Sequence, residues 1–542
     1  MNGAMIRKSL GTLVPLAVIT SSNSFILTHS TPSSAAAKKA AHTTPTLLNM
    51  SQKKRSSGTN PFSSMLGDLA SSIISSSNNK ISNSDELNAK LEKLSPLSWE
   101  EIRSQWEQSC ATEEERNFRQ LVQQGLVASP LNQIRLFHEN QKEEDIRVTF
   151  YRDSASWCPY CQKVWFALEE KQIPYRVEKI NMSCYGDKPR DFLTRIQPNG
   201  QIPVCIIDGQ MYGQSNDILA GLEGLFPEHK SLQPKEQETQ ARSYLRLEQA
   251  LAGAWLGWLR SNNNAGAKRQ FERTIDAVEQ ALNDIEGPFF MGSEVSLVDV
   301  QFLSFLERMC ASLLYFKGFE IRTAPGSKTN KFPAINRWFD ALEEKLSYQL
   351  TKSDYYTHAW DLPPQLGGCG EEPDGEPYRI KINGGDGTSW HLPLEPHNGG
   401  IEPDWNFCGS SFTDHKREAV ERLSQNHQGI VSFASRGAGK KGMPPVMAAL
   451  ADPNATPNTA VQVGVNVVLQ IVALALLGDI SSELEDKLQQ VAKISDKTYT
   501  QQGLIPSLQY LRDRIGVPRD MRYPAARQLR AHLNWAIDTL EK

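Results

Sequence analysis

The sequence predicts an α/β domain built on a short mixed sheet, followed by an all-helical domain and a further, mainly helical extension. Three observations predict this fold class. A strand-like run, Val148–Tyr151, leads into a helix-like segment at 162–171. Asp208-Gly209 between two apolar runs is a strong hairpin signal. From residue 237 to 355, apolar side chains recur with spacings of three and four, which is typical of packed helices.

The elements and boundaries follow in order along the chain. We predict strands at 147–152, 175–181, 203–208 and 210–213, with helices at 162–171, 188–197 and 215–225. The expected parts are a presequence and disordered linker at 1–83, a helical lead-in at 84–146, the α/β domain at 147–228, the helical domain at 235–360, and a Gly/Pro-rich segment with a helical extension at 361–542. We expect the lead-in to pack on the α/β domain.

Composition excludes several classes of protein. The 542 residues carry a net charge of −4, and charged residues make up 22% of them, so the balance predicts neither nucleic acid nor an anionic membrane surface as partner. Eight cysteines in a chain of this length do not make a disulfide framework, which favours a reducing compartment. The apolar segment Val461–Leu477 contains four polar or glycine positions, and we interpret it as a buried helix instead of a membrane span.

The N-terminal segment has the pattern of a targeting presequence. Arg7 and Lys8 precede the apolar run Leu10–Thr20, as in a signal peptide, and no Asp or Glu occurs before Asp68, as in a transit peptide. A signal peptide joined to a transit peptide resembles the bipartite presequence of algal plastids acquired by secondary endosymbiosis, and Phe25 fits the aromatic position after the cleavage point. The expected location is the plastid of an alga. An ordinary secretory signal with a disordered linker is the alternative.

Trp157-Cys158-Pro159-Tyr160-Cys161 carries the clearest chemical signal. It follows the first strand and opens the first helix, where the backbone N–H groups lack intrahelical partners and the helix dipole is positive. Both effects stabilise a thiolate, and cysteines in such settings have pKa values of roughly 3.5–7.5 against about 8.5 when free. Cys161 lies almost one turn further on, within reach of a mixed disulfide at Cys158. We predict redox or glutathione chemistry with both cysteines as catalytic residues.

Three other interpretations of the two cysteines stay open. A zinc site needs four ligands, and the sequence contains no second Cys-x-x-Cys to complete one, so we predict no metal ligands. A second alternative is that the two cysteines are merely buried and have a structural role only. A shared iron–sulfur cluster (2Fe–2S) is a minor alternative, because a cysteine of this kind can ligate iron together with glutathione.

The order of domains resembles the cytosolic-type glutathione transferases, in which a thioredoxin-like domain precedes an all-helical domain. Ser296-Leu297-Val298-Asp299, which opens an apolar helix as a capping box, belongs to that pattern. Cys-Pro-Tyr-Cys in place of a catalytic Ser or Tyr resembles the cysteine classes and the glutaredoxin signature. The stretches that resemble the iota class of photosynthetic organisms are Trp157–Trp165, Ile173–Val177, Tyr185-Gly186, Arg337–Glu343 and Lys352–His358. The resemblance covers about residues 130–365.

The resemblance implies roles for further residues. Cys158 corresponds to the catalytic cysteine, and Tyr160 of the same motif belongs to the glutathione-binding residues. Pro203 would be the cis-proline, with Val204 offering its backbone to the cysteinyl part of glutathione. Ser215, at the N-terminus of a helix, would bind the γ-glutamyl carboxylate.

Gln214 departs from the family pattern. The family usually has an acidic residue at this place, which meets the amine of glutathione, and Gln214 lacks that charge. Weaker or altered glutathione binding is therefore expected, and Asp217 could compensate.

Two hypotheses for the function follow, from different classes. The first is a glutathione-dependent thiol transferase that reduces glutathione mixed disulfides or small disulfides through a Cys158 thiolate, with dehydroascorbate and quinone conjugates as further substrates. The second is a glutathione- or iron–sulfur-binding scaffold whose C-terminal extension binds a partner or ligand. Glutathione is the expected co-substrate, and a homodimer is the oligomer that the resemblance suggests.

Overall fold

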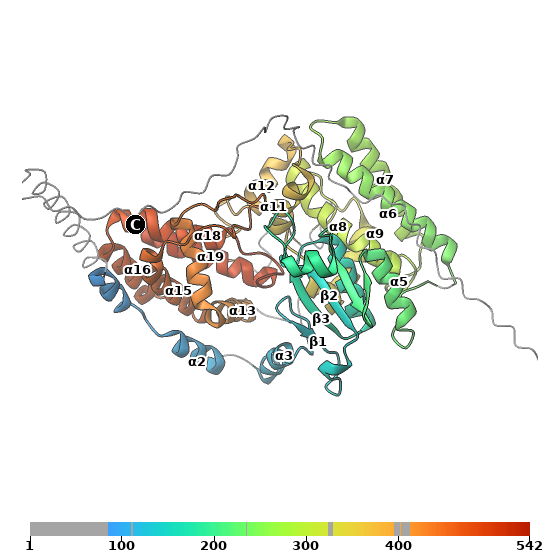
Figure 1. Cartoon of the computed structure of the whole chain (residues 1–542). Coiled ribbons are helices and arrows are strands. Elements are labelled where there is room, and N and C mark those ends of the chain that lie inside the picture. The colour runs from blue at the N-terminus through green and yellow to red at the C-terminus, as the bar shows by residue number, and fades with distance from the viewer. Residues whose placement is uncertain (1–84, 110–111, 235, 324–328, 395–401, 403–411) are drawn as a thin grey trace, which may run out of the picture. The chain divides into compact units, whose positions relative to one another are not determined.

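A five-stranded mixed sheet lies at the centre of the α/β domain. The computed structural model describes residues 85–109, 112–234, 236–323, 329–394, 402 and 412–542, and the presequence predicted at 1–83 lies outside them. The strands are β1 (Ile134–Arg135), β2 (Val148–Asp153), β3 (Tyr175–Ile180), β4 (Val204–Ile207) and β5 (Gln210–Tyr212). Their order is β1-β3-β2-β4-β5, with β2 and β3 parallel and the other pairs antiparallel (Figure 1).

The local sequence explains most of this sheet. Side chains of β2 alternate between buried and half-buried over most of the strand, as a pleated strand requires. Asp208 and Gly209, which join β4 to β5, both have positive φ angles, of 50° and 81°, which confirms the predicted tight turn. The edge strand β1 comes from the segment predicted as a helical lead-in, so the sheet has one strand more than the sequence predicts.

Two helices of the α/β domain frame the predicted motif. Helix α4 (Pro159–Lys171) begins three residues before the predicted start, with Pro159 in its first turn, and ends where Gln172 takes a left-handed φ of 54°. Helix α5 (Ser215–Leu225) matches the prediction. The segment predicted as a helix at 188–197 forms a shorter element, the π-helical turn η2 (Phe192–Ile196).

The helical domain confirms the predicted fold class. Its helices are α6 (Glu238–Leu259), α7 (Ala265–Asn283), α8 (Leu297–Lys317), α9 (Pro333–Glu343), α10 (Leu346–Thr351) and α11 (Tyr355–Leu366). Helix α8 starts at the predicted capping box, in which Ser296 and Asp299 bond each other's backbone. Nearly every residue of α8 is buried, because α4, α6 and α11 all pack around it.

The extension is mainly helical, as predicted. Its helices are α12 (Glu376–Ile382), α13 (Phe412–Gln425), α14 (His427–Ala434), α15 (Gln462–Leu477), α16 (Ser482–Ile494), α17 (Lys497–Tyr499), α18 (Ile505–Arg512) and α19 (Tyr523–Glu541). Among the described residues, one segment, Thr459–Leu477, is long and apolar enough to cross a membrane. Two thirds of it is buried inside the protein (67%), in line with the predicted core helix α15.

The N-terminal helices of the lead-in do not pack as expected, although its strand β1 joins the sheet. Helix α2 (Trp99–Ser109) lies against α13 and α15 of the extension, not on the α/β domain. The Trp99 indole donates to Asn466 Oδ1 at 2.8 Å, and Ile102 is fully buried in the extension's core. The sequence indicates the apolar positions of this helix, but it does not identify a packing partner more than 300 residues away. Helix α3 (Glu113–Gln123) follows and also bonds α13, through Arg119 and Glu421.

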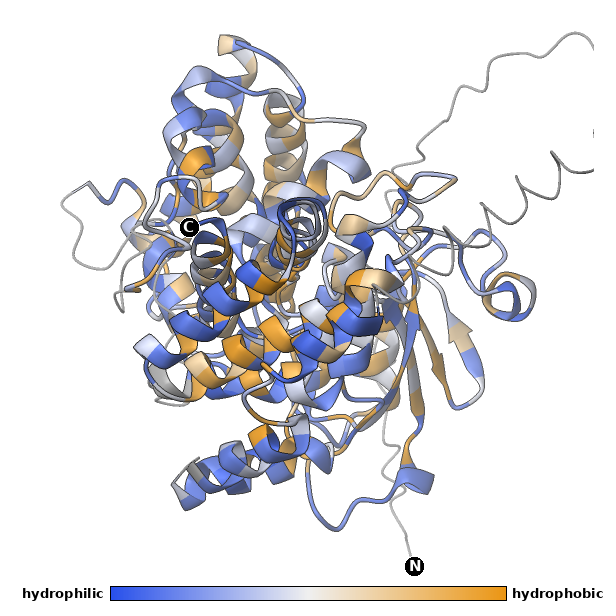
Figure 2. Ribbon diagram, turned by 90° about the vertical axis from the view of Figure 1, so that its left-hand side faces the viewer, coloured by the Kyte–Doolittle hydropathy of each residue, from blue (hydrophilic) through white to orange (hydrophobic). Residues whose placement is uncertain are grey.

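Two large hydrophobic cores stabilise the unit Leu87–Lys542. The first core joins the sheet, α4 and the helical domain, and it also takes Ala448 and Leu450 from the extension. The second core belongs to the extension and the lead-in. Figure 2 shows many helices with one hydrophobic and one hydrophilic face. The extension is therefore joined to the α/β and helical domains by shared packing.

Candidate functional site

Cys158 lies at the predicted place, immediately before helix α4. It is the N-cap residue, and Pro159 occupies the first helical position. Its backbone carbonyl accepts the Gln162 N–H at 3.0 Å, which starts the helical ladder. The residue is 8% exposed, so a small part of it reaches the surface. The thiol is thus held at a helix N-terminus, where free N–H groups and the dipole favour an anion.

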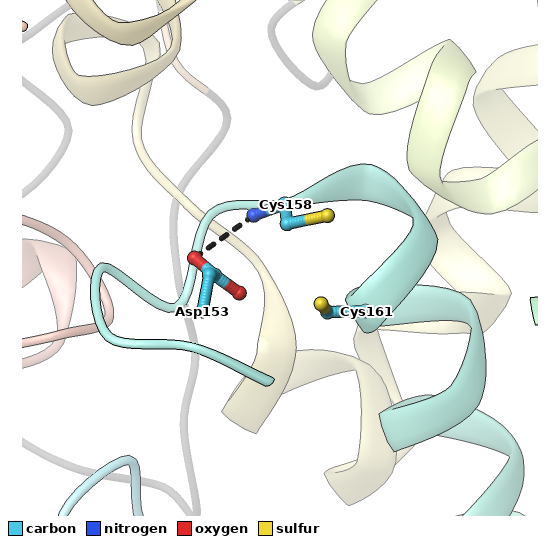
Figure 3. A group of neighbouring side chains, drawn as sticks. All are labelled: Asp153, Cys158 and Cys161. Atoms are coloured by element: carbon cyan, nitrogen blue, oxygen red, sulfur yellow. Dashed lines mark hydrogen bonds between the residues drawn. The ribbon is translucent and has the colours of Figure 1, made fainter. Parts of the chain in front are cut away.

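Asp153 holds the loop that presents Cys158. It ends β2, and its Oδ2 accepts the N–H of Trp157 at 2.5 Å and the N–H of Cys158 at 3.0 Å. Its Oδ1 is buried and has no hydrogen-bond partner. One potential ligand atom each from Asp153, Cys158 and Cys161 lies within 4.8 Å of the others (Figure 3). These three side chains are the donors that could hold a metal ion here, and sequence reasoning did not include Asp153.

Cys161 faces inward from the first turn of α4. It is 2% exposed, and burial raises its pKa well above the ordinary value. A hydrogen bond with Cys158 and the negative charges of Cys158 and Asp153 raise the pKa further. Cys161 is therefore a neutral thiol around pH 7. The structure brings the two predicted cysteines together, but their environments differ.

The other predicted residues surround the same end of the sheet. Val204 pairs with Tyr151 of β2, and the preceding Ile202–Pro203 peptide bond is cis. Ser215 is the first residue of α5, and Gln214 is its N-cap residue. Antiparallel pairing of β4 with β2 thus brings this turn to the end of the sheet from which the Cys158 loop leaves.

Gln214 and Tyr160 have contacts of their own. The Gln214 amide does not cap α5 but donates to Gln201 Oε1 at 3.2 Å, on the exposed side. Tyr160 is 37% exposed, and its ring meets Phe305 of α8 edge-on, with centroids 5.8 Å apart. Desolvation and the negative charge of Cys158 raise the pKa of the Tyr160 hydroxyl to about 12, so it is a hydrogen-bond donor at neutral pH.

A buried polar chain supports the loop from behind. The Trp157 indole donates to His358 Nδ1 at 2.9 Å, and His358 Nε2 contacts Glu307 Oε1 at 2.8 Å. Because Nδ1 accepts, Nε2 carries the proton of a neutral ring and donates it to Glu307. Burial lowers the pKa of His358, which keeps the ring neutral around pH 7. His358 ends a stretch noted in the sequence, yet no signal there linked it to Cys158.

Lys188 is a basic side chain whose charge interacts with the cluster of cysteines. Burial lowers its pKa, while the negative charges of Cys161, Cys158 and Asp153 oppose that effect. The ammonium group donates to the Asn181 carbonyl. A half-buried cation therefore borders the cluster of cysteines, where it suits an anionic ligand.

The chain is similar in sequence to glutathione S-transferases. The profile of the glutathione S-transferase N-terminal domain matches residues 157–225, and that of the glutathione S-transferase C-terminal domain matches residues 244–339. Glutathione S-transferase DHAR2 of Arabidopsis thaliana is 30% identical over 197 residues, which span 36% of this chain and 84% of that protein. The chloroplastic glutathione S-transferase DHAR3 of the same plant is 24% identical over 198 residues, which span 36% of this chain and 69% of that protein. Glutathione transferase Omega 3C from Trametes versicolor, a solved structure, is 23% identical and has a TM-score of 0.34, covering 40% of this chain and 92% of that one.

Proposed function

The chain belongs to the glutathione S-transferase family, and from this premise we propose that it is a glutathione-dependent thiol transferase working through a Cys158 thiolate. The observation that carries the proposal is the position of Cys158, which is the N-cap residue of α4, is partly exposed, and has the half-buried Lys188 among the charges that act on it. A conjugating transferase keeps glutathione non-covalent and activates its thiol with a hydroxyl. A cysteine at that place favours covalent exchange instead. We assign the chain to the iota class on the stretches quoted above.

The proposed reaction has two thiol–disulfide exchanges. The Cys158 thiolate attacks the glutathione sulfur of a mixed disulfide, the S–S bond breaks, and the substrate leaves as a thiolate. A second glutathione thiolate then attacks the Cys158–glutathione disulfide, which releases oxidised glutathione and restores the Cys158 thiolate. Dehydroascorbate and quinone conjugates are further substrates that suit this chemistry.

The raised pKa of Cys161 supports a monothiol mechanism. A neutral buried thiol is a poor attacking group, so the second glutathione resolves the mixed disulfide faster than Cys161 does. The measurement is glutathione-dependent reduction of hydroxyethyl disulfide by the full chain and by Cys158→Ser and Cys161→Ser. We expect Cys158→Ser to lose activity by about 100-fold or more, as removal of a covalent nucleophile does. Cys161→Ser should keep most of it.

Two results would contradict this mechanism. If Cys158→Ser kept its activity, Cys158 would not be the nucleophile. Loss of activity in Cys161→Ser, with Cys158 intact and the protein folded, would require a dithiol mechanism in place of resolution by glutathione.

Metal or cluster binding is a second candidate, favoured by the convergence of Asp153, Cys158 and Cys161. Two thiolates and one carboxylate suit a soft or borderline ion such as Zn²⁺ or iron. Protein purified without oxygen would then contain stoichiometric metal, or show visible absorbance in the case of an iron–sulfur cluster. Either signal should disappear in Cys158→Ser, and its absence from the parent protein would exclude this candidate.

We also propose a plastid location. The presequence pattern at 1–83 supports it, and two of the relatives, from Arabidopsis thaliana and Oryza sativa, are named as chloroplastic. A fluorescent protein fused behind residues 1–83 should accumulate in the plastid of an alga with a secondary plastid. Secretion of the fusion would favour the simple signal peptide.

A further inference from the structure

The extension carries a closed surface loop, residues 440–456, which we call the extension loop. Lys440 and Thr456 close its base through two backbone hydrogen bonds, each 3.0 Å long. Within the loop, the Asn454 amide donates to the Pro444 carbonyl at 2.7 Å. These bonds between the two halves of the loop fix its shape, so its exposed side chains are presented at defined positions.

One side of the extension loop packs on the segment 181–188, which follows strand β3. Ala448 donates its N–H to the Cys184 carbonyl at 3.0 Å, and both residues are buried in the same hydrophobic core. Gly186 lets Pro453 approach closely, because a Cβ at this glycine would lie 3.2 Å from the Pro453 Cγ atom. The extension loop is therefore anchored on the α/β domain.

The same segment borders the loop that presents Cys158. Asn181 Oδ1 accepts the hydroxyl of Ser154, a residue of that loop, at 2.8 Å. The Asn181 amide donates to the Asp187 carbonyl at 3.1 Å, and Lys188 donates to the Asn181 carbonyl. Consecutive hydrogen bonds and packing contacts therefore lead from the extension loop, through segment 181–188, to the loop of Cys158.

The exposed part of the extension loop is apolar. Met443 is 78% exposed and Met447 is 60% exposed, and Pro444 and Pro445 between them are exposed as well. A single exposed apolar side chain is ordinary, but apolar side chains that gather at one place mark an interaction surface. Methionine is flexible and adapts to partners of different shape. The stretch 443–447 is therefore a surface that a partner can cover.

Two cations lie beside this apolar stretch in the chain. Lys440 and Lys441 are exposed, and neither forms an ion pair with a residue that the structure describes. The carboxylate of the loop, Asp452, is half-buried, and its Oδ1 would lie 2.3 Å from a Cβ at Gly442. The whole chain has a net charge of −4, so the positive charge is local. A partner that carries acidic residues beside apolar ones complements this surface.

We propose that the extension loop is a docking surface for glutathionylated proteins in which acidic and apolar residues surround the modified cysteine. This inference rests on the proposed function, in which Cys158 takes glutathione from a mixed disulfide. A protein that covers Met443 and Met447 lies beside segment 181–188, and this segment borders the loop of Cys158. Docking raises the effective concentration of the mixed disulfide at Cys158. Small disulfides gain nothing from it, because they have no second surface to dock.

Two other occupants suit a basic and apolar surface, namely an anionic membrane and a second copy of the chain. Either of them would cover Met443 and Met447 wherever these lay on the molecule. The contacts with segment 181–188 favour a substrate protein, because they place the surface next to the loop that carries the proposed nucleophile.

The test compares a protein and a small molecule as substrates of the full chain. Glutathionylated serum albumin is the protein substrate, and hydroxyethyl disulfide is the small one, both with glutathione as reductant. One double variant, Met443→Ser with Met447→Ser, removes the apolar groups. A second, Lys440→Gln with Lys441→Gln, removes the charges. All four side chains are exposed, so neither double variant disturbs a core.

We expect the methionine variant to lower kcat/KM for albumin about tenfold through a higher KM, because docking is equally strong before and during the reaction. The lysine variant should lower it about threefold at low salt and leave it unchanged at about 0.5 M salt. Neither should change kcat/KM for hydroxyethyl disulfide. Met211→Ser is the matched control, since Met211 on β5 is 50% exposed and its loss should affect neither substrate. Equal losses with both substrates, or no loss with albumin, would overturn the proposal.

A second measurement does not depend on catalysis. Surface plasmon resonance measures the binding of glutathionylated albumin to the full chain with Cys158→Ser, in which no exchange occurs. Adding Met443→Ser and Met447→Ser should raise the Kd about tenfold. If the parent reduced neither disulfide, the proposed function would fail, and this binding would still decide for or against the docking surface.

Two controls distinguish the other occupants. Sedimentation velocity compares the oligomeric state of the parent with that of the methionine variant, and co-sedimentation measures binding to vesicles of phosphatidylcholine and phosphatidylserine. We expect the same oligomeric state in both proteins and no vesicle binding that depends on the extension loop. A dimer or a vesicle complex that the methionine variant loses, with albumin binding unchanged, would overturn the proposal in favour of that occupant.

Discussion

At the residue scale, two cysteines in one helical turn have different environments. Cys158 caps α4 and is 8% exposed, whereas Cys161 is 2% exposed and its pKa is raised by burial. Disulfide exchange needs a thiolate that can reach the attacked sulfur along its S–S axis. A Cys-x-x-Cys spacing alone does not decide between a dithiol and a monothiol mechanism, because the burial of the second thiol sets its charge.

Asp361 on α11 gives a prediction for the pH dependence of stability. Its Oδ1 accepts the Tyr185 hydroxyl at 2.5 Å, its Oδ2 has no partner, and burial raises its pKa from 3.8 to about 7. Between these values the folded protein holds a proton that the unfolded chain releases, so stability from this group is present at low pH and is lost as pH rises through about 7. Asp361→Asn keeps the acceptor and removes the titration.

We expect Asp361→Asn to become more stable relative to the parent by about 2–3 kcal/mol between pH 5 and pH 8. Urea unfolding at several pH values measures the difference. Asp538 is an exposed carboxylate on α19, and Asp538→Asn should give a profile parallel to that of the parent. A parallel profile for Asp361→Asn as well would show that Asp361 is ionised in the fold throughout this range.

The sequence predicted one part of the site and missed the other, for a physical reason. Cys158, Pro203 and Ser215 sit at strand ends and helix starts, which local patterns mark. Arg308 and His358 contact Trp157 from 151 and 201 residues away. Such contacts follow from how α8 and α11 pack behind α4, and no local pattern encodes that.

At the element scale, local sequence patterns also fail to predict some elements or their exact starts. Strand β1 has two residues, Ile134 and Arg135, which is too short for an alternating pattern to stand out. It exists because β3 offers an open edge. Helix α4 starts at Pro159 because proline suits the first turn, although the apolar spacing begins only later.

We expect the N-terminal cap of helix α8 to contribute more to the free energy of unfolding than an ordinary helix cap. Asp299 is fully buried and accepts the Ser296 N–H at 2.8 Å, the Phe290 N–H at 3.1 Å and the Trp338 indole at 2.9 Å. Removing the carboxylate leaves these donors buried without partners, at about 1–3 kcal/mol each. We expect Asp299→Ala to cost about 3 kcal/mol or more in unfolding free energy, measured by urea denaturation.

Ser481 provides the matched control for that prediction. It caps α16 by accepting the Leu484 N–H at 3.3 Å, and it is exposed. Ser481→Ala should cost about 1 kcal/mol or less, as for an ordinary N-cap. If Asp299→Ala cost no more than Ser481→Ala, the buried donors would have found other partners, and the capping box would be no more than a local helix signal.

At the scale of the whole molecule, helix α11 joins the extension to the part of the chain that carries Cys158. One of its residues, His358, bonds Trp157 beside Cys158, and another, Thr357, accepts the Val517 N–H of the extension at 3.2 Å. Ala448 of the extension donates its N–H to the Cys184 carbonyl at 3.0 Å. The extension is thus built into the support of the site, so its stability and the geometry of Cys158 depend on shared contacts.

A further contact between the two parts is the buried ion pair between Arg530 and Asp354. The two side chains are fully buried, with Nη1 and Oδ2 at 2.9 Å. Asp354 also caps α11 by accepting the Thr357 N–H at 2.9 Å. Arg530→Met would leave the Asp354 carboxylate buried without its counter-charge. We expect this to lower the free energy of unfolding by about 3–5 kcal/mol, which is roughly a third of the stability of a typical domain.

We expect this loss to appear in both parts of the unit at once. Hydrogen–deuterium exchange should speed up in α11 and in α19 together, because the pair couples the two helices. Asp354→Asn combined with Arg530→Met should recover part of the stability, since no unpaired charge then remains and the asparagine can still accept the Thr357 N–H. Faster exchange confined to α19, with α11 unchanged, would mean that the extension unfolds on its own and does not support the site beside Cys158.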